Sequence, residues 1–307
     1  MMSDEKKLLF VVNPHSGRGA VKAHLMEIVN TFSTQGYLTT VCPTQRSGQA
    51  NEIIARFGGE YDRIVASGGD GTVNEAVNGL MQLDRRIPLG IMPMGTTNDY
   101  AYTLGIPNDP VKAAETAVTG TPRDIDLGLF NGRYFTYVAA FGIFTDVCYE
   151  TPQNLKNALG GVAYALEGIK KAQDLHTEYI TISYDGGVIM DEFLAALITN
   201  TVSVAGMRSA LEGASLDDGL LDVTLIRPPK TLADIQTIIN ILTDFEHLTT
   251  VNNSFLTHFT TTHARITSDT PVKWTLDGEN GGALTEAEIS NVHLAATVIT
   301  GNTTRIE

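Results

Sequence analysis

The chain has 307 residues, 43% of them hydrophobic, so it can bury one large core or, at the usual size of domains, two. Its net charge is −14, and residues 131–307 carry 10 Lys and Arg against 21 Asp and Glu. This balance disfavours nucleic acid as a partner and gives no support for broad attraction to anionic lipid surfaces. Cys42 and Cys148 lie far apart without metal-type spacing, and no stretch resembles a signal-peptide core or a membrane span of roughly 20 apolar residues. We therefore expect a cytoplasmic protein.

The first predicted strand is the apolar run of residues 8–12, and a polar loop at residues 13–19 (the first loop) follows it. Apolar residues at helical spacing then continue to Phe32, and Gly36 stops that helix. The first loop lacks the Gly-Lys-Ser/Thr of a Walker motif, which disfavours a P-loop NTPase. Ser16, Arg18 and the loop amides could still hold phosphate, and a plain turn is the alternative.

The next loop of interest joins a strand to a helix. After a predicted strand at residues 38–42 and a helix at residues 49–57, residues 64–66 read as a short strand and residues 72–80 as a helix. Between them lies Gly68-Gly69-Asp70-Gly71 (the central turn), whose three glycines leave backbone N–H groups unshielded at a helix N-terminus, where phosphate binds well.

Asp70 changes the chemistry that this turn favours. A carboxylate in an anion-binding turn would repel phosphate unless a cation intervened, so its presence indicates a Mg²⁺ ion that bridges Asp70 and a nucleotide. A plain Asp-Gly turn is again the alternative.

A third loop (residues 93–99) follows the predicted strand at residues 89–92, and a short helix then runs to Leu104. All three loops thus come directly after strands of one open parallel sheet. Ligands bind such sheets at the carboxyl edge of the strands, so we expect the three loops to converge on one nucleotide.

The pattern changes after a predicted helix at residues 109–118. Residues 123–130 and 134–140 flank an Asn131-Gly132 turn, which is typical of an antiparallel hairpin. We predict an α/β protein with an N-terminal doubly wound, mostly parallel nucleotide-binding domain (residues 1–130) and a C-terminal β-rich, sandwich-like domain (residues 131–307).

Four further segments belong to the predicted second domain. They comprise strands at residues 179–184 and 188–199, an apolar helical stripe over residues 155–169 that is typical of a core but could touch lipid, and a structural helix at residues 232–245. The last strand, at residues 291–299, could join either domain.

Three motifs together resemble the diacylglycerol kinase catalytic family, in particular its soluble bacterial lipid kinases. They are Asn13-Pro14-x-Ser16-Gly17, Gly68-Gly69-Asp70-Gly71-Thr72-x-Asn74-Glu75 and Pro93-x-Gly95-Thr96-x-Asn98-Asp99. The resemblance covers nearly the whole chain and implies ATP and Mg²⁺ as cofactors, with Asp70 as a catalytic residue. The residues that it places around the nucleotide are Asn13, Pro14, Ser16, Gly17, Arg18, Thr44, Gly68, Gly69, Gly71, Thr72, Asn74, Glu75, Thr96, Asn98 and Asp99.

Residues 215–222 resemble the acidic turn that holds a structural Mg²⁺ in this family. Asp218 corresponds to the side-chain ligand, and Ser215 and Leu220 correspond to the other two protein contacts. Adjacent carboxylates and a glycine suit a hard cation, although an ordinary Asp-Asp-Gly turn has the same composition. Ser215 departs from those relatives that have a carboxylate at this position.

Residues 274–279 resemble the segment with the family's catalytic glutamate, which corresponds to Glu279. From the residues alone, Asp277-Gly278 is a hairpin turn and Glu279 lies at the surface. The resemblance implies instead that Glu279 accepts the proton of a lipid hydroxyl as this attacks the γ-phosphate of ATP, in a cleft that closes between the domains.

The implied reaction is ATP-dependent phosphorylation of a lipid, with diacylglycerol as the first choice of acceptor and phosphatidic acid as the product. The protein would contact the inner face of the membrane transiently and peripherally, and a homodimer is a candidate assembly because homodimers are common. One alternative is a soluble-substrate kinase similar to NAD kinase, which shares Gly-Gly-Asp-Gly-Thr. The other is a lipid-binding regulatory module without catalysis.

Overall fold

The structure is a computed structural model, and it divides into two compact units. It describes residues 5–95, 98–143, 145, 175–200, 203–204, 207–208, 215–231, 233–236, 238 and 255–301. The first unit comprises Met1–Asp126 and Leu294–Glu307, and the second comprises Leu127–His293. The expected second domain ran to the end of the chain, whereas the end of the chain belongs to the first unit.

The first unit contains a parallel sheet in the order β2-β1-β3-β4-β16. Its strands are β1 (Lys6–Val12), β2 (Tyr37–Pro43), β3 (Arg63–Gly68), β4 (Leu89–Pro93) and the end of β16 (Glu279–Thr300). Its helices are α1 (Ala20–Thr34), α2 (Gln49–Phe57), α3 (Asp70–Leu80), α4 (Asp99–Thr103) and α5 (Pro110–Thr119), with 3-10 turns η1 (Ser16–Gly19) and η2 (Gly58–Glu60).

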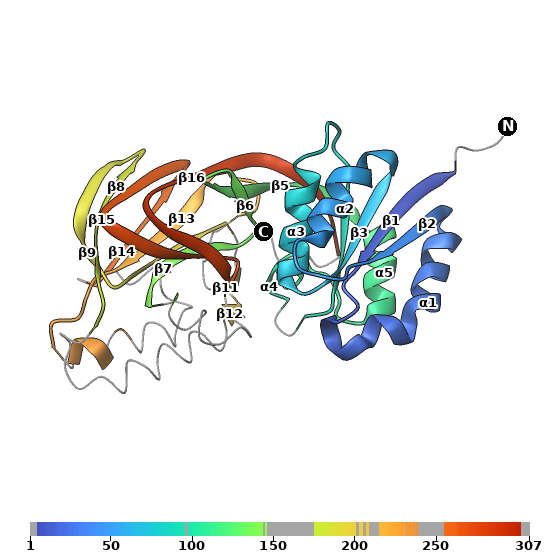
Figure 1. The fold of residues 1–307 in the computed structure, drawn as a ribbon, viewed down its shortest axis with the longest axis horizontal. Coiled ribbons are helices and arrows are strands. Elements are labelled where there is room, and N and C mark those ends of the chain that lie inside the picture. The colour runs from blue at the N-terminus through green and yellow to red at the C-terminus, as the bar shows by residue number, and fades with distance from the viewer. Residues whose placement is uncertain are drawn as a thin grey trace. The chain divides into compact units, whose positions relative to one another are not determined.

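The helices of this unit cover both faces of the sheet. The chain passes from β1 to β2 in one direction and then crosses back to β3, so right-handed connections place α1 and α2 on opposite faces. Accordingly, α1 packs against α5 and α2 packs against α3, as Figure 1 shows. The strand order reverses between β1 and β3, and such a switch point opens a crevice at the carboxyl ends of these two strands. The prediction of a doubly wound sheet is confirmed.

The second unit is built from antiparallel strands in the order β14-β13-β10-β7-β15-β16, and the β8–β9 hairpin pairs with β15 (Figure 1). The strands are β5 (Thr121–Phe130), β6 (Arg133–Phe135), β7 (Val138–Gly142), β8 (Glu178–Tyr184), β9 (Gly187–Phe193), β10 (Ala195–Thr199), β11 (Ser203–Val204), β12 (Met207–Arg208), β13 (Leu221–Ile226), β14 (Leu256–Thr261) and β15 (His263–Leu276). These strands confirm the prediction of a β-rich second part. The boundary between the two units falls within β5 and within β16.

Two predicted strands of this unit are each divided in two. The Asn131-Gly132 turn joins β5 to β6 with positive φ at both residues, as the hairpin signal predicts. The strand predicted at residues 134–140 is divided into β6, which pairs with β5, and β7, which pairs with β10 and β15. Similarly, the run predicted at residues 188–199 is interrupted at Leu194, whose N–H donates to the Ile226 carbonyl. The helical stripe at residues 155–169 lies outside the described residues, and the helix at 232–245 is described only at residues 233–236 and 238.

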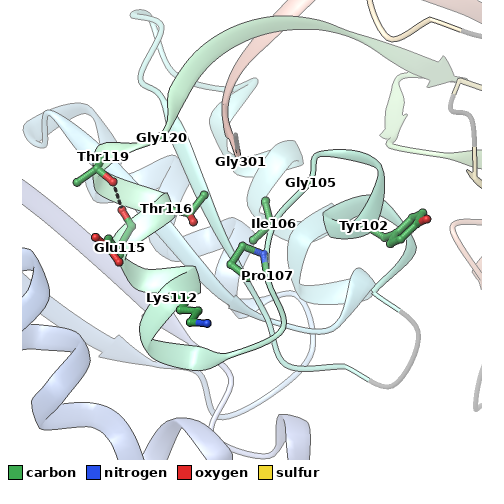
Figure 2. Close-up of a pocket in the computed structure, with 10 residues that line it drawn as sticks. All are labelled: Tyr102, Gly105, Ile106, Pro107, Lys112, Glu115, Thr116, Thr119, Gly120 and Gly301. Atoms are coloured by element: carbon green, nitrogen blue, oxygen red, sulfur yellow. Dashed lines mark hydrogen bonds between the residues drawn. The ribbon is translucent and has the colours of Figure 1, made fainter. Parts of the chain in front are cut away.

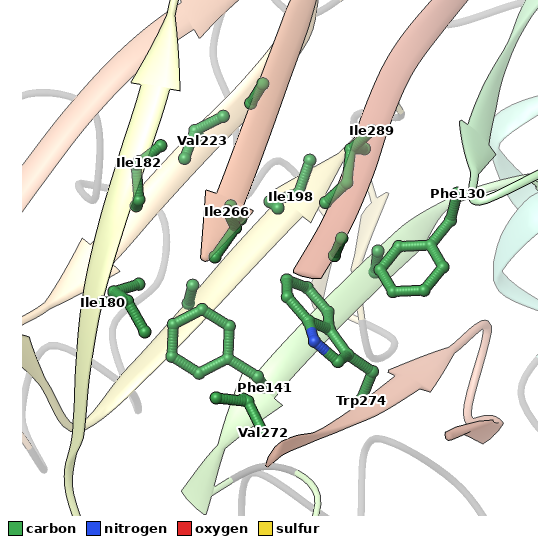
Figure 3. Close-up of a cluster of buried hydrophobic side chains, with 14 of the residues drawn as sticks. Phe130, Phe141, Ile180, Ile182, Ile198, Val223, Ile266, Val272, Trp274 and Ile289 are labelled. Atoms are coloured by element: carbon green, nitrogen blue, oxygen red, sulfur yellow. The ribbon is translucent and has the colours of Figure 1, made fainter. Parts of the chain in front are cut away.

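The core of the second unit surrounds Trp274, whose side chain is almost fully buried. Its ring centroid lies 4.9 Å from that of Phe130 and 5.1 Å from that of Phe141, and aliphatic side chains fill the space around these rings (Figure 3). Because Trp274 lies near the end of β15, this packing anchors the hairpin that leads to Glu279. Among the described residues, no helix combines the length and the apolar character that crossing a membrane requires.

Candidate nucleotide-binding and catalytic residues

The first loop and the central turn meet at the carboxyl edge of the first unit's sheet. The N–H of Asn13 donates to the Ser67 carbonyl at 2.8 Å, which continues the pairing of β1 with β3. The side-chain amide of Asn13 donates to the Thr72 hydroxyl at 3.2 Å. Asn13 thereby spans the switch point between β1 and β3, where ligands of such sheets bind.

The central turn and the third loop also meet. The N–H of Asn98 donates to Oδ2 of Asp70 at 3.1 Å, and the N–H of Met94 donates to the Gly68 carbonyl at 2.8 Å. Asn98 has a positive φ of 53° and closes the third loop with its own side chain. Its Oδ1 accepts from the Gly95 N–H at 2.8 Å, while its Nδ2 donates to the Gly95 carbonyl at 3.0 Å.

Glycines allow the three backbones to approach this closely. A Cβ atom on Gly95 would lie 2.8 Å from the Cα of Gly69, so a side chain at residue 95 would force the two loops apart. A Cβ atom on Gly17, which has a φ of +60°, would lie 2.7 Å from the Met94 carbonyl oxygen. The structure therefore brings all three loops together, as the order of strands predicts.

Asp70 is the first residue of α3, and the extended Gly69 precedes it as the N-cap. The amides at a helix N-terminus and the positive end of the helix dipole favour an anion here. Mg²⁺ in nucleotide sites usually has one or two protein carboxylates together with phosphate oxygens and waters as ligands. Asp70 beside these amides suits that role, although no cluster of three or more Asp, Glu, His or Cys is present among the described residues.

Other residues of the predicted nucleotide set lie near the same edge. Thr44 is buried, and its N–H donates to the Val12 carbonyl at 2.8 Å, which places it beside the start of the first loop. Thr72, Asn74 and Asp99 are also buried. Ser16, Gly17 and Arg18 lie in η1 after Pro14, Gly71 lies in α3, and Thr96 lies outside the described residues.

Glu75 has a different set of partners from the one that its place in the motif suggests. Its carboxylate accepts from the N–H groups of Gly48 at 2.7 Å and Ala50 at 3.1 Å, and from the Ser47 hydroxyl at 3.2 Å. These groups form the N-terminus of α2, which has no side-chain cap of its own. Sequence reasoning missed this contact because the two partners belong to different helices. The role of Glu75 in nucleotide binding stays a prediction.

The predicted structural metal residues lie in one turn of the second unit. The Ser215 hydroxyl donates to Asp217 at 2.5 Å, and the Leu220 N–H donates to Oδ1 of Asp218 at 2.9 Å. The Leu220 carbonyl accepts from Nδ2 of Asn291 at 3.0 Å. These bonds bring Asp218 and Leu220 together but turn the Ser215 hydroxyl toward Asp217, and metal binding here stays a prediction.

Glu279 follows a tight turn between β15 and β16. Asp277 and Gly278 both have positive φ, 49° and 81°, and Leu276 pairs with Glu279 across the hairpin. The Glu279 side chain is 41% exposed, and its Oε2 lies 2.9 Å from Nη2 of Arg133. The hairpin turn is thus present, and it presents a half-exposed carboxylate that an arginine orients.

Asp277 is the residue of this segment whose importance sequence reasoning missed. Its side chain is buried and accepts hydrogen bonds from the N–H groups of Thr136, Tyr137 and Val138 and from the Thr136 hydroxyl. Burial raises the pKa of the Asp277 carboxyl above its ordinary value, while the hydrogen bonds act in the opposite direction. The sequence identified only an Asp-Gly turn, because the three amides lie far away in the chain.

The first unit also contains a cavity of about 640 Å³ between the end of α4 and α5 (Figure 2). Glycines, two oppositely charged residues and two threonines are among the residues that line it, and no lining residue belongs to the three loops. Its lining residues are Tyr102, Gly105, Ile106, Pro107, Lys112, Glu115, Thr116, Thr119, Gly120 and Gly301.

Comparisons with known proteins agree across the two units. The profile of the diacylglycerol kinase catalytic domain matches residues 7–130, and that of the YegS C-terminal NAD kinase beta sandwich-like domain matches residues 141–299. A diacylglycerol kinase of Bacillus subtilis strain 168 is 37% identical over 284 residues, which cover 91% of each chain. A diacylglycerol kinase of Staphylococcus aureus strain JH9 is 34% identical over 280 residues, covering 91% of this chain and 88% of its own. The crystal structure of a candidate diacylglycerol kinase from Bacillus anthracis strain Sterne has a TM-score of 0.83 at 25% identity, covering 98% of this chain and 99% of its own.

Proposed function

The chain belongs to the diacylglycerol kinase family, and we propose that it transfers the γ-phosphate of ATP to the hydroxyl of diacylglycerol, forming phosphatidic acid. The observation that carries this proposal is the meeting of the three loops around Asp70, where Asn13, Thr72 and Asn98 link them by hydrogen bonds. Glycine amides and a helix N-terminus at the carboxyl edge of an open sheet suit the phosphates of a nucleotide.

The residues of the first unit serve the phosphate donor. The N-terminal amides of α3 and the amides of the central turn bind phosphate oxygens, and Asp70 holds the cation that accompanies the nucleotide. When bound, Mg²⁺ neutralises negative charge on the β- and γ-phosphates. Because Asn98 donates to Asp70 and also closes the third loop, the carboxylate is oriented before the nucleotide arrives.

Glu279 serves the acceptor. The hydroxyl oxygen of the lipid forms a bond to the γ-phosphorus, the bond from this phosphorus to the β–γ bridging oxygen breaks, and ADP leaves. The hydroxyl proton passes to the Glu279 carboxylate, so atoms and charge balance. A half-exposed side chain suits this role because the hydroxyl must reach it. The lipid is presented at a membrane surface, so the protein contacts the inner face of the membrane peripherally and transiently.

The test is phosphoryl transfer from labelled ATP in the presence of Mg²⁺ and mixed micelles containing diacylglycerol. We expect labelled phosphatidic acid, and we expect Asp70→Asn to lower kcat by about 10²-fold or more, as loss of a preorganised electrostatic group does. Asp84→Asn is the matched control, since Asp84 is exposed beyond the end of α3, and it should retain activity. Label in NAD⁺ rather than in lipid, or in no acceptor at all, would overturn the proposal.

A further inference from the structure

Asp277 is held more tightly than a hairpin turn requires. The two oxygens of its carboxylate share four donors, which are three consecutive backbone amides and one hydroxyl at distances of 2.7–3.0 Å. The Asp277 N–H also donates to the Val138 carbonyl at 2.8 Å. A buried carboxylate is costly without such partners, so the turn adopts this position only when residues 136–138 present their amides.

The segment that holds Asp277 also holds Glu279. Arg133 lies three residues before Thr136, and it binds Oε2 of Glu279 at 2.9 Å and the Asn280 carbonyl at 3.1 Å. Residues 133–138 therefore contact the hairpin on both sides of Gly278. Within the hairpin, the Thr275 hydroxyl donates a further hydrogen bond to the Glu279 carbonyl at 2.9 Å.

The base of the same hairpin is fixed in the core. Trp274 packs between Phe130 and Phe141 (Figure 3), and β15 pairs with β7 from Trp274 to Leu276. The chain therefore has little freedom before residue 277. The contacts of Asp277 with residues 136–138 then fix the direction in which the turn leaves the sheet.

We propose that Asp277 is a positioning residue for Glu279: by binding the amides of residues 136–138, it fixes where the Glu279 carboxylate meets the acceptor hydroxyl. This inference rests on the proposed function, in which Glu279 accepts the proton. Proton transfer requires the base within hydrogen-bond reach of the hydroxyl, and a displacement of about 1 Å can cost about 10²-fold in rate.

The substitution Asp277→Asn tests this role with little strain in the backbone, because Asn tolerates the positive φ of residue 277. One carboxylate oxygen becomes an NH₂ group that opposes the amide donors. We expect kcat to fall by about 10- to 100-fold with KM for ATP within about twofold of wild type, since the three loops are unchanged.

A double-mutant cycle separates positioning from a general loss of structure. If Asp277 acts through Glu279, adding Asp277→Asn to Glu279→Gln should change kcat by less than about threefold, because the base is already lost. The inference would be overturned if the two substitutions lowered kcat independently, so that the fall in the double variant equalled the product of the two single falls. It would also be overturned if Asp277→Asn kept the wild-type kcat.

The chain offers a matched control in Asp185, at the β8–β9 turn of the same unit. Its carboxylate accepts from the N–H and hydroxyl of Thr262 and from the Thr261 hydroxyl, and these bonds hold its pKa below the ordinary value. Like Asp277→Asn, Asp185→Asn disrupts the hydrogen bonds to a carboxylate, so it should lower the Tm while leaving kcat unchanged. A fall in kcat equal to that of Asp277→Asn would contradict the inference.

Thr136→Val keeps the test valid if Asp277→Asn does not fold. Val has nearly the shape of Thr, so this change removes the hydroxyl bond to Asp277 and little else. It should lower kcat by a smaller factor and show the same non-additivity with Glu279→Gln. Failure of the proposed function looks different: wild-type protein would label no lipid, or Glu279→Gln would keep wild-type kcat, and either result overturns both proposals.

Discussion

At the scale of single residues, the shape of the third loop depends on Asn98 and Gly95. Asn98 tolerates a left-handed backbone better than most residues, and its short amide side chain reaches both backbone groups of Gly95. The same backbone turn directs the Asn98 N–H at Asp70. Two residues three positions apart thus close the loop, and one of them, Asn98, also donates to a carboxylate of the central turn.

Gly95→Ala should separate the central turn from the third loop. The new Cβ would lie 2.8 Å from the Cα of Gly69 and 2.7 Å from Oδ1 of Asn98, and the backbone of Gly69 cannot yield as a side chain can. We expect a loss of about 1–3 kcal/mol in the free energy of unfolding and weaker binding of a non-hydrolysable ATP analogue by calorimetry. Gly59→Ala is the control, because a Cβ there meets nothing within 4 Å. Equal affinity in the two variants would contradict the expectation.

At the scale of elements, α2 and α3 are joined by a cap that one helix supplies to the other. The N-cap residue of α2 is Gly48, which has no side chain to accept the first amides of the helix. Glu75 in α3 supplies the missing acceptor and places a negative charge at the positive end of the α2 dipole. The contact links the helix of the central turn to its neighbour.

Glu75→Gln should therefore act on stability rather than on nucleotide affinity. Loss of a charged cap should lower the free energy of unfolding by about 1 kcal/mol, while KM for ATP stays within about twofold of wild type. Chemical denaturation and initial rates measure the two effects. Glu60→Gln, at an exposed position in η2, serves as the control. If KM for ATP instead rose tenfold with unchanged stability, Glu75 would belong to the nucleotide site.

At the scale of the whole molecule, β16 takes part in the cores of both units. Its early residues pair with β15 as far as Ser290, whereas Val298 pairs with Leu89 of β4. Ile289 and Ile299 lie in this one strand, and both are fully buried. The unit boundary falls between them, so residues ten positions apart stabilise different units.

This arrangement predicts that Ile289→Ala and Ile299→Ala destabilise different parts of the protein. Each change should cost about 2–5 kcal/mol, as for other buried Ile→Ala substitutions. Hydrogen exchange should become faster mainly in β3 and β4 for Ile299→Ala, and mainly in β15 for Ile289→Ala. The two variants control for each other, and an identical exchange pattern would show that the units unfold together.

Much of the local structure could be predicted from short stretches of sequence. The helix predicted at residues 49–57 has the bounds of α2, the Asn131-Gly132 turn joins β5 to β6, and each of the three loops follows a parallel strand. Hydrophobic periodicity and turn chemistry act over a few residues, so the sequence displays them directly. The meeting of the three loops at the carboxyl edge of the sheet followed from the order of these elements.

The contacts that shape the candidate site depended on residues distant in the chain. Asp277 meets residues 136–138, Glu75 caps α2, and the end of β16 joins β4. By itself, the sequence determined which of the described segments are mainly strand or helix and where the glycine-rich loops between them lie, because neighbouring residues decide these. Only the tertiary structure decided that Asp277 binds three backbone amides, that Glu75 caps α2 and that the end of β16 joins the sheet of the first unit. Each of these contacts needs a partner that is distant in the chain and that only packing brings near.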